Sequence, residues 1–165
     1  MRIFALGFAA FAVFIAILIH APLAESDEKK PVTFNVTMMG EIVDRAAIDA
    51  GFRTRLFPDE VHLGFKKLDA SDGQKLVIQD GEFRTPDEAA RYLDWSVQNR
   101  ADRVITNGKK VNREGKTVGR RTEVLLKSDS KTKTWMVAWT DEAYFFVVYA
   151  PTLECALQVE KQSQH

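Results

Sequence analysis

The sequence predicts an α+β fold: an antiparallel β-sheet of hairpins packed by two or three helices, after an N-terminal apolar export helix. Strand-like segments are grouped in hairpins and are interrupted by helices rather than alternating with them, which indicates an antiparallel sheet. A strong capping pattern at Thr85 marks a helix in the middle of the chain. An uncharged run, residues 3–19, precedes all of these segments.

The N-terminal run has the layout of an export signal. It follows Met1 and Arg2 and is followed by the small residues Ala21 and Ala24. At about 1.5 Å per residue its length falls slightly short of a hydrocarbon core of ~30 Å, which favours a cleaved signal over a permanent anchor. The expected division of the chain is a signal peptide or uncleaved signal anchor at residues 1–24, a polar linker at residues 25–31 and a single globular α+β domain at residues 32–165.

The first half of the domain is expected to be an antiparallel meander. Alternation of apolar and polar residues from Val32 to Met38 predicts a half-buried strand, and helical spacing from Ile42 to Ala50 predicts a short helix that ends at Gly51. A turn is expected at Asp80-Gly81. The strands of this half are predicted at residues 32–38, 52–57, 61–66 and 76–78.

The second half begins with the clearest local signal in the chain. Thr85 can cap a helix whose first residue is Pro86, and Glu88 completes a capping box, so a helix is expected to run to about Arg100. A turn is expected at Asn107-Gly108. Three more strands are predicted at residues 117–127, 134–140 and 143–149, and a last helix at residues 152–162.

The segments 135–139 and 144–149 are apolar on both sides of the strand, which predicts that their hairpin lies at the centre of the sheet. With a turn centred on Asp141-Glu142, Trp139 faces Tyr144. The helices are expected on one face, so that another segment, a protein partner or a small apolar ligand covers the other face. The candidate apolar surface consists of Trp135, Trp139, Tyr144 and Phe146.

The most unusual charge pattern is a basic stretch at residues 103–121, with seven lysine or arginine residues and Glu114 as the one acidic residue. On an exposed hairpin it is either a contact for an anionic polymer or a device for solubility that guards a sheet edge. Nucleic acid is not expected as a partner, because few aromatic residues interleave with the charges and the whole chain has no net charge. The candidate anion contacts are Lys109, Lys110, Arg113, Lys116, Arg120 and Arg121.

Residues with catalytic or metal-binding chemistry are scarce. The body of the domain has one histidine, His62, expected to be exposed on a strand, and one cysteine, Cys155, expected to be a small buried apolar residue that forms no intramolecular disulfide. No catalytic, cofactor-binding or metal-binding residues are therefore predicted, and no cofactor is expected.

The function best supported by the sequence is an exported, non-enzymatic binding or accessory domain that acts outside the cytoplasmic membrane, in the periplasm or the extracellular space. A first alternative is a membrane-anchored protein-interaction module that retains residues 3–19, its one expected contact with the membrane. A second alternative is an enzyme of unrecognised class.

Overall fold

The computed structural model describes residues 32–127 and 133–163. The predicted export segment, residues 1–24, and the predicted linker, residues 25–31, lie outside the described residues. Pro31–His165 forms one compact unit, and its described residues build one sheet and three helices.

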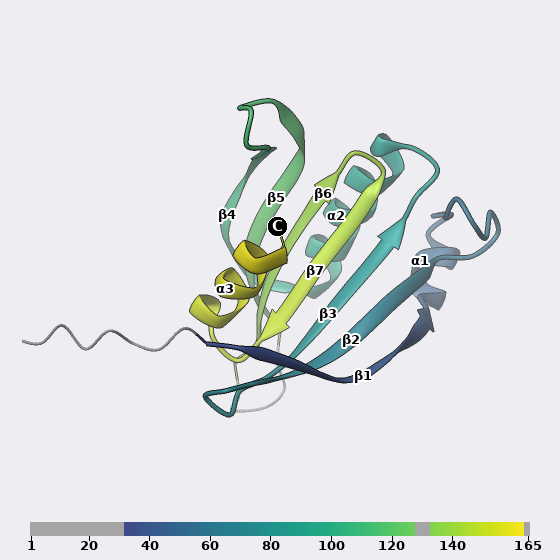
Figure 1. Ribbon diagram of the computed structural model, residues 1–165. Coiled ribbons are helices and arrows are strands. Elements are labelled where there is room, and N and C mark those ends of the chain that lie inside the picture. The colour runs from purple at the N-terminus through teal and green to yellow at the C-terminus, as the bar shows by residue number, and fades with distance from the viewer. Residues whose placement is uncertain (1–31, 128–132, 164–165) are drawn as a thin grey trace, which may run out of the picture. The chain divides into compact units, whose positions relative to one another are not determined.

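Seven strands form the sheet, in which every neighbouring pair is antiparallel, in the order β1-β2-β3-β7-β6-β5-β4 (Figure 1). The strands are β1 (Phe34–Val43), β2 (His62–Ala70), β3 (Lys75–Glu82), β4 (Ala101–Val111), β5 (Thr117–Leu126), β6 (Trp135–Asp141) and β7 (Tyr144–Ala150). The helices are α1 (Arg45–Asp49), α2 (Pro86–Arg100) and α3 (Leu153–Ser163). The predicted α+β class and antiparallel sheet are confirmed.

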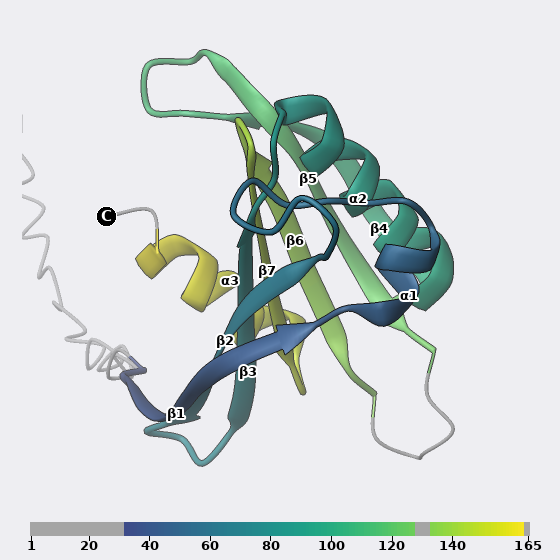
Figure 2. The same cartoon turned by 90° about the vertical axis from the view of Figure 1, so that its right-hand side faces the viewer.

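Helices lie on both faces of the sheet, so the expectation that they share one face is wrong. Figure 2 shows α1 and α2 on one side and α3 on the other. We call the side that carries α3 the front face. After Pro151 the chain turns back over the sheet, and the small apolar side chains of Cys155, Ala156 and Val159 pack on Val137 and Trp139. The helix α3 is thus a segment of the chain that covers part of the face for which another segment, a protein partner or a ligand was expected.

The helix α2 begins as its capping residues predict. The Thr85 hydroxyl accepts a hydrogen bond from the Glu88 amide at 3.1 Å, and Pro86 occupies the first turn. The Glu88 carboxylate reaches back to the Arg84 amide at 3.2 Å. The helix buries Tyr92, among other residues, against the back of the sheet.

A partly buried polar network ties α1, α2 and the sheet together. Asp44, which caps α1, accepts hydrogen bonds from the Tyr92 hydroxyl at 2.7 Å and from the Arg100 guanidinium at 3.0 Å. The same guanidinium donates to the Tyr149 hydroxyl at 2.6 Å. Because these polar groups satisfy one another, the network is structural and holds the back of the sheet in a fixed register with α2.

The edge strand β1 departs most from its prediction. It continues through Ile42 and Val43, which were expected to begin the helix, and α1 is only five residues long. The predicted half-burial holds for Val32 and Phe34, which pack against the core, but it is wrong farther along the strand, where Val36 is 53% exposed and Met38 is 49% exposed. An edge strand has only one neighbouring strand and little cover from the helices. These alternating apolar residues therefore remain exposed.

Three local predictions about strands and turns are wrong. Residues 52–57 form a loop with a single bridge from Thr54 to Phe83 rather than a strand. The Asp80-Gly81 and Asn107-Gly108 pairs lie inside β3 and β4, since pairing with distant strands overrides the local turn preference. The turns themselves use Gly73 and Gly115, each with positive φ.

The β6–β7 hairpin lies at the centre of the sheet, as predicted, because β7 is the fourth of seven strands. Its register differs from the prediction: Trp139 faces Phe146, and Asp141 faces Tyr144. The loop is Glu142-Ala143, and Glu142 adopts the left-handed conformation with φ 51°. The register differs by two residues, so the predicted division of side chains between the two faces still holds.

Candidate functional site

A cleft of about 470 Å³ opens on the front face between the β4–β5 hairpin and the end of α3. The hairpin contributes residues 110–114 and Val118, and Ser163 lies at the helix end. The sheet contributes Trp139, Asp141 and Phe146. A cleft of this size falls within the range that holds a small ligand or a few side chains of a partner.

Three stacked aromatic rings lead across the sheet from the floor of the cleft. Trp139 stacks on Phe146 with ring centroids 5.5 Å apart, and Phe146 stacks on Tyr144 at 6.3 Å. Exposure rises along this row: Trp139 is 5% exposed, Phe146 is half-buried and Tyr144 is 46% exposed. Trp135, the fourth predicted member of the apolar surface, lies at the far end of β6 and does not line the cleft.

A buried ion cluster supports the wall of the cleft. Glu160 of α3 pairs with Lys110 of β4 at 2.9 Å and with Arg121 of β5 at 2.7 Å. Burial alone would raise the pKa of Glu160, but the hydrogen bonds from Arg121 and Lys110 outweigh burial and lower it. The Lys110 ammonium also lies 5.1 Å from the centroid of the Trp139 ring. The cluster thus fixes α3, the hairpin and the aromatic floor relative to one another.

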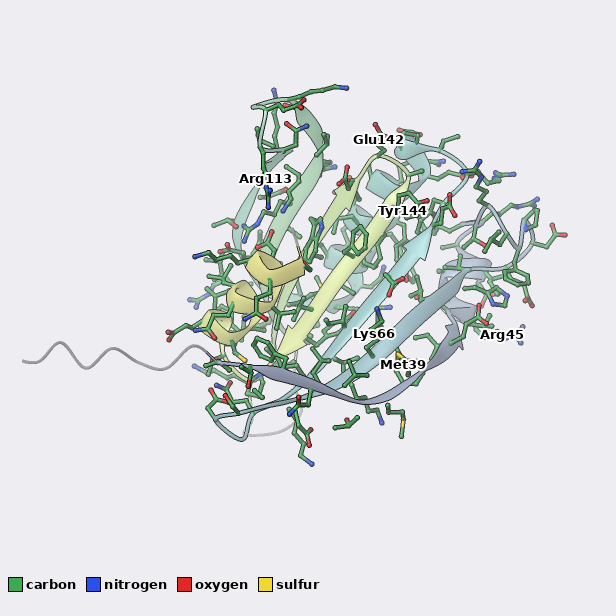
Figure 3. All side chains as sticks on the ribbon, in the orientation of Figure 1. Met39, Arg45, Lys66, Arg113, Glu142 and Tyr144 are labelled. Carbon is green, nitrogen blue, oxygen red and sulfur yellow. The ribbon has the colours of Figure 1, made fainter. Side chains whose placement is uncertain are left out.

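The predicted anion contacts do not share one surface. Lys110 and Arg121 face α3, whereas Arg120 pairs with Asp94 of α2 on the back face. The expectation that these side chains are exposed is wrong for Lys110, which is only 9% exposed because Glu160 draws it beneath the helix. Lys109 and Lys116 are exposed, and Arg113 lies at the hairpin tip beside α3 (Figure 3).

The structure brings part of the basic stretch and part of the apolar surface into one cleft. Lys110 and Arg113 line it together with Trp139 and Phe146. Sequence reasoning treated the two sets as separate candidates. The two sets meet because β5 pairs with β6 in a register that puts Arg121 opposite Trp139. Local sequence patterns do not determine this register, so the sequence alone could not have joined the two sets.

A second hollow of about 260 Å³ lies on the same face, over β2 and β3. Its lining includes three carboxylates, those of Glu41, Asp80 and Glu82, with the aromatic rings of Phe57 and Tyr144 beside them. Sequence reasoning missed this hollow, because its members come from four strands, β1, β2, β3 and β7, and from the 52–57 loop. We call it the acidic hollow.

His62 lies at the edge of the acidic hollow and is not the exposed histidine that was predicted. Its Nδ1 is 2.7 Å from a Glu41 oxygen and its Nε2 is 2.8 Å from a Glu60 oxygen, while the ring stacks on Phe57 at 3.8 Å. Two carboxylate neighbours favour the form in which both nitrogens donate, the imidazolium. Burial would lower the pKa of His62, but the hydrogen bonds to Glu60 and Glu41 outweigh it and raise the pKa above 6.5.

This raised pKa predicts how stability depends on pH. Because the folded state holds the His62 proton more tightly than the unfolded state, the stabilisation is fully present below about pH 6.5 and is lost as pH rises through the folded pKa. Urea midpoints of the wild type and of His62→Gln, measured across this window, should differ most at low pH and converge at high pH. A difference that is flat or that grows with pH would contradict the assignment.

The cysteine and the metal-ligand side chains in the described part of the chain form neither a reactive-thiol site nor a metal site. Cys155 is buried, and desolvation raises its pKa, which suits the predicted small apolar residue and not a reactive thiol. Within residues 32–127 and 133–163, no three His, Cys, Asp or Glu side chains form a group that could hold a metal ion. Among these same residues no helix has the length and apolar character needed to cross a membrane.

Comparison with known proteins gives no relative. No protein-family model matches the chain, and neither a curated protein nor a solved structure does. Its function is therefore inferred from its own residues and their geometry.

Proposed function

We propose that the chain is an exported, non-enzymatic binding or accessory domain, and that the cleft beside α3 is its binding site. One observation carries the proposal: aromatic side chains and charged hairpin residues, far apart in the sequence, converge on a single cavity. The ligand is expected to insert an apolar or aromatic group over Trp139 and Phe146. It is either a small apolar molecule or a side chain of a protein partner.

The charges of the cleft favour a neutral or zwitterionic ligand over a polyanion. Its lining has two basic residues, Lys110 and Arg113, and two acidic residues, Glu114 and Asp141. Lys110 is already held by Glu160. The exposed Lys109 and Lys116 lie outside the cleft lining and are the proposed contact for an anionic polymer, separate from the cleft.

The make-up of the cleft supports a binding role over catalysis. Its floor is aromatic, with Trp139 and Phe146, and its lining residue Lys110 is already held by Glu160. An enzyme of unrecognised class stays the weaker proposal.

Export is proposed from the sequence of residues 1–24, and a retained anchor is the alternative. N-terminal sequencing of the mature protein separates the two. A start between Ala21 and Ser26 means that the domain is released, whereas an intact N-terminus means that it works as a membrane-anchored interaction module.

The binding proposal predicts a specific loss of affinity. Val118 is half-buried and lines the cleft, so Val118→Glu adds a charge to the cleft lining and should weaken binding of the apolar probe anilinonaphthalene sulfonate by about tenfold or more. A fluorescence titration measures this change.

The matched control is Val104→Glu on the edge strand β4. Val104 is 47% exposed and lies outside the cleft lining, so this variant should bind the probe like the wild type. Thermal melts of both variants check that the domain still folds. Equal binding of the probe by the wild type and Val118→Glu would show that the cleft is not the site. A parallel titration with polyphosphate measures binding at the separate contact, Lys109 and Lys116.

A further inference from the structure

We infer that the ligand of the front face is an extended polypeptide segment that places an apolar side chain in the cleft and a basic side chain in the acidic hollow. This inference rests on the proposed function, because it names the class of ligand that the cleft receives. It adds a second contact, the acidic hollow, and a defined spacing between the two.

The cleft and the acidic hollow belong to one continuous surface. In the sheet register Asp80 lies opposite Phe146, which lies opposite Trp139, so one row of paired residues runs from the hollow to the floor of the cleft. Tyr144, which lines the hollow, stacks on Phe146, which lines the cleft. Figure 1 shows α3 over the lower part of this face and no helix over β3 and the upper part of β7, and Figure 3 shows Tyr144 there.

The three carboxylates of the hollow favour a bound cation. Arg55 satisfies Glu82 at 2.8 Å and His62 satisfies Glu41 at 2.7 Å. Asp80 is different: its half-buried carboxylate lies over Gly64, where an added Cβ would be 3.4 Å from both oxygens, and it has no ion-pair or hydrogen-bond partner among the described residues. A half-buried carboxylate without a partner favours an incoming ammonium or guanidinium group.

The two aromatic rings of the hollow suit the same kind of group. Phe57 is 43% exposed and Tyr144 is 46% exposed, and both line the hollow beside the carboxylates. Aromatic faces next to carboxylates hold the alkyl stem and the charged head of lysine or arginine. A basic side chain therefore fits the hollow better than a bare metal ion does, in keeping with the lack of a metal-binding group among the described residues.

Strand geometry sets the spacing of the two side chains. The middle of the hollow lies between β2 and β3 and the middle of the cleft lies between β6 and β5, three strand spacings apart in the order of the sheet. At about 4.8 Å per spacing the two centres are about 14 Å apart, which an extended chain covers in about four residues. A separation of four also puts both side chains on the same side of the extended segment.

The experiment uses short peptides with blocked ends and a fluorescent label, titrated into the full chain and followed by anisotropy. One peptide has a phenylalanine and a lysine four positions apart among glycine and serine, in both orders along the chain. A second has serine in place of the lysine, and a third has glutamate there. The proteins are the wild type, Asp80→Asn and a control, Asp102→Asn, which makes the same change at an exposed position on β4, at the opposite edge of the sheet from β1.

The lysine peptide should bind best and the glutamate peptide worst. Asp80→Asn should weaken the lysine peptide by about fivefold or more and leave the serine peptide unchanged, because it removes the charge that meets the lysine. Asp102→Asn should change neither.

The inference and the proposed function fail in different ways. If Asp80→Asn leaves the preference for lysine intact, or if only a small apolar probe binds and no peptide does, the peptide inference is overturned and cleft binding stands. If neither the peptides nor the apolar probe bind, the proposed function is overturned as well.

Discussion

Replacing Glu160 with alanine is expected to lower the free energy of unfolding by about 3–5 kcal/mol, the cost of removing one partner of a buried ion pair. The side chain of Glu160 is 7% exposed and meets two cations, Lys110 and Arg121, beneath α3. Without this carboxylate, Lys110 loses its counter-ion and Arg121 keeps only Glu123, in a site that excludes most water. A urea unfolding curve measures the loss.

The control for this variant is Glu154→Ala, at an exposed position in the first turn of the same helix, which should shift the midpoint little. A quadruple variant, in which Lys110 and Arg121 become methionine, Glu160 becomes leucine and Glu123 becomes glutamine, should recover much of the stability, because it removes the four mutually paired charges together. If Glu160→Ala is as stable as Glu154→Ala, the ion cluster does not hold α3 on the sheet.

Trp139→Ala is expected to cost about 3–5 kcal/mol, as large aromatic truncations in a core do. Trp139 is 5% exposed between α3, Phe146 and the Lys110 ammonium, so its removal leaves a cavity under the helix as well as a gap in the floor of the cleft. A denaturation midpoint gives the size of the effect.

Two comparisons sharpen this result. Trp135→Ala should cost less, because Trp135 is only half-buried, and Tyr144→Ala should remain close to the wild type, because Tyr144 is 46% exposed. The order Trp139, Trp135, Tyr144 is therefore the expected order of destabilisation. If Trp139→Ala has a wild-type midpoint and loses only ligand affinity, Trp139 belongs to the binding surface and not to the core.

The sequence predicted correctly those features of the fold that depend on residues close together in the chain. The Thr85 and Glu88 cap specifies the start of α2 by bonds within one turn, and the structure has those bonds. The hairpin around residues 135–150 was predicted to be central because it is apolar on both sides, and burial by two layers of helices is the physical reason.

Predictions failed where a distant partner decides. Asp80-Gly81 and Asn107-Gly108 are good turn sequences, but each is held inside a strand by pairing to neighbours that a local pattern does not reveal. For the same reason, the sequence predicted the aromatic and basic residues of the candidate site but not that they share one cleft. Residue types identified the aromatic and basic sets, whereas their meeting in one cleft depends on Glu160, whose carboxylate reaches from the last helix to both strands of the hairpin.

The position of α3 after all seven strands of the sheet bears on the order of events during synthesis. Until its eleven residues are made, Val137, Trp139 and Val148 lack the cover of the helix, and Lys110 and Arg121 lack the carboxylate that joins them. The amide of Gln162 also donates to the Val32 carbonyl at 3.2 Å, so the last turn of the domain meets its first described residue. A nascent chain of this topology closes its front face only after all seven strands of the sheet have been made.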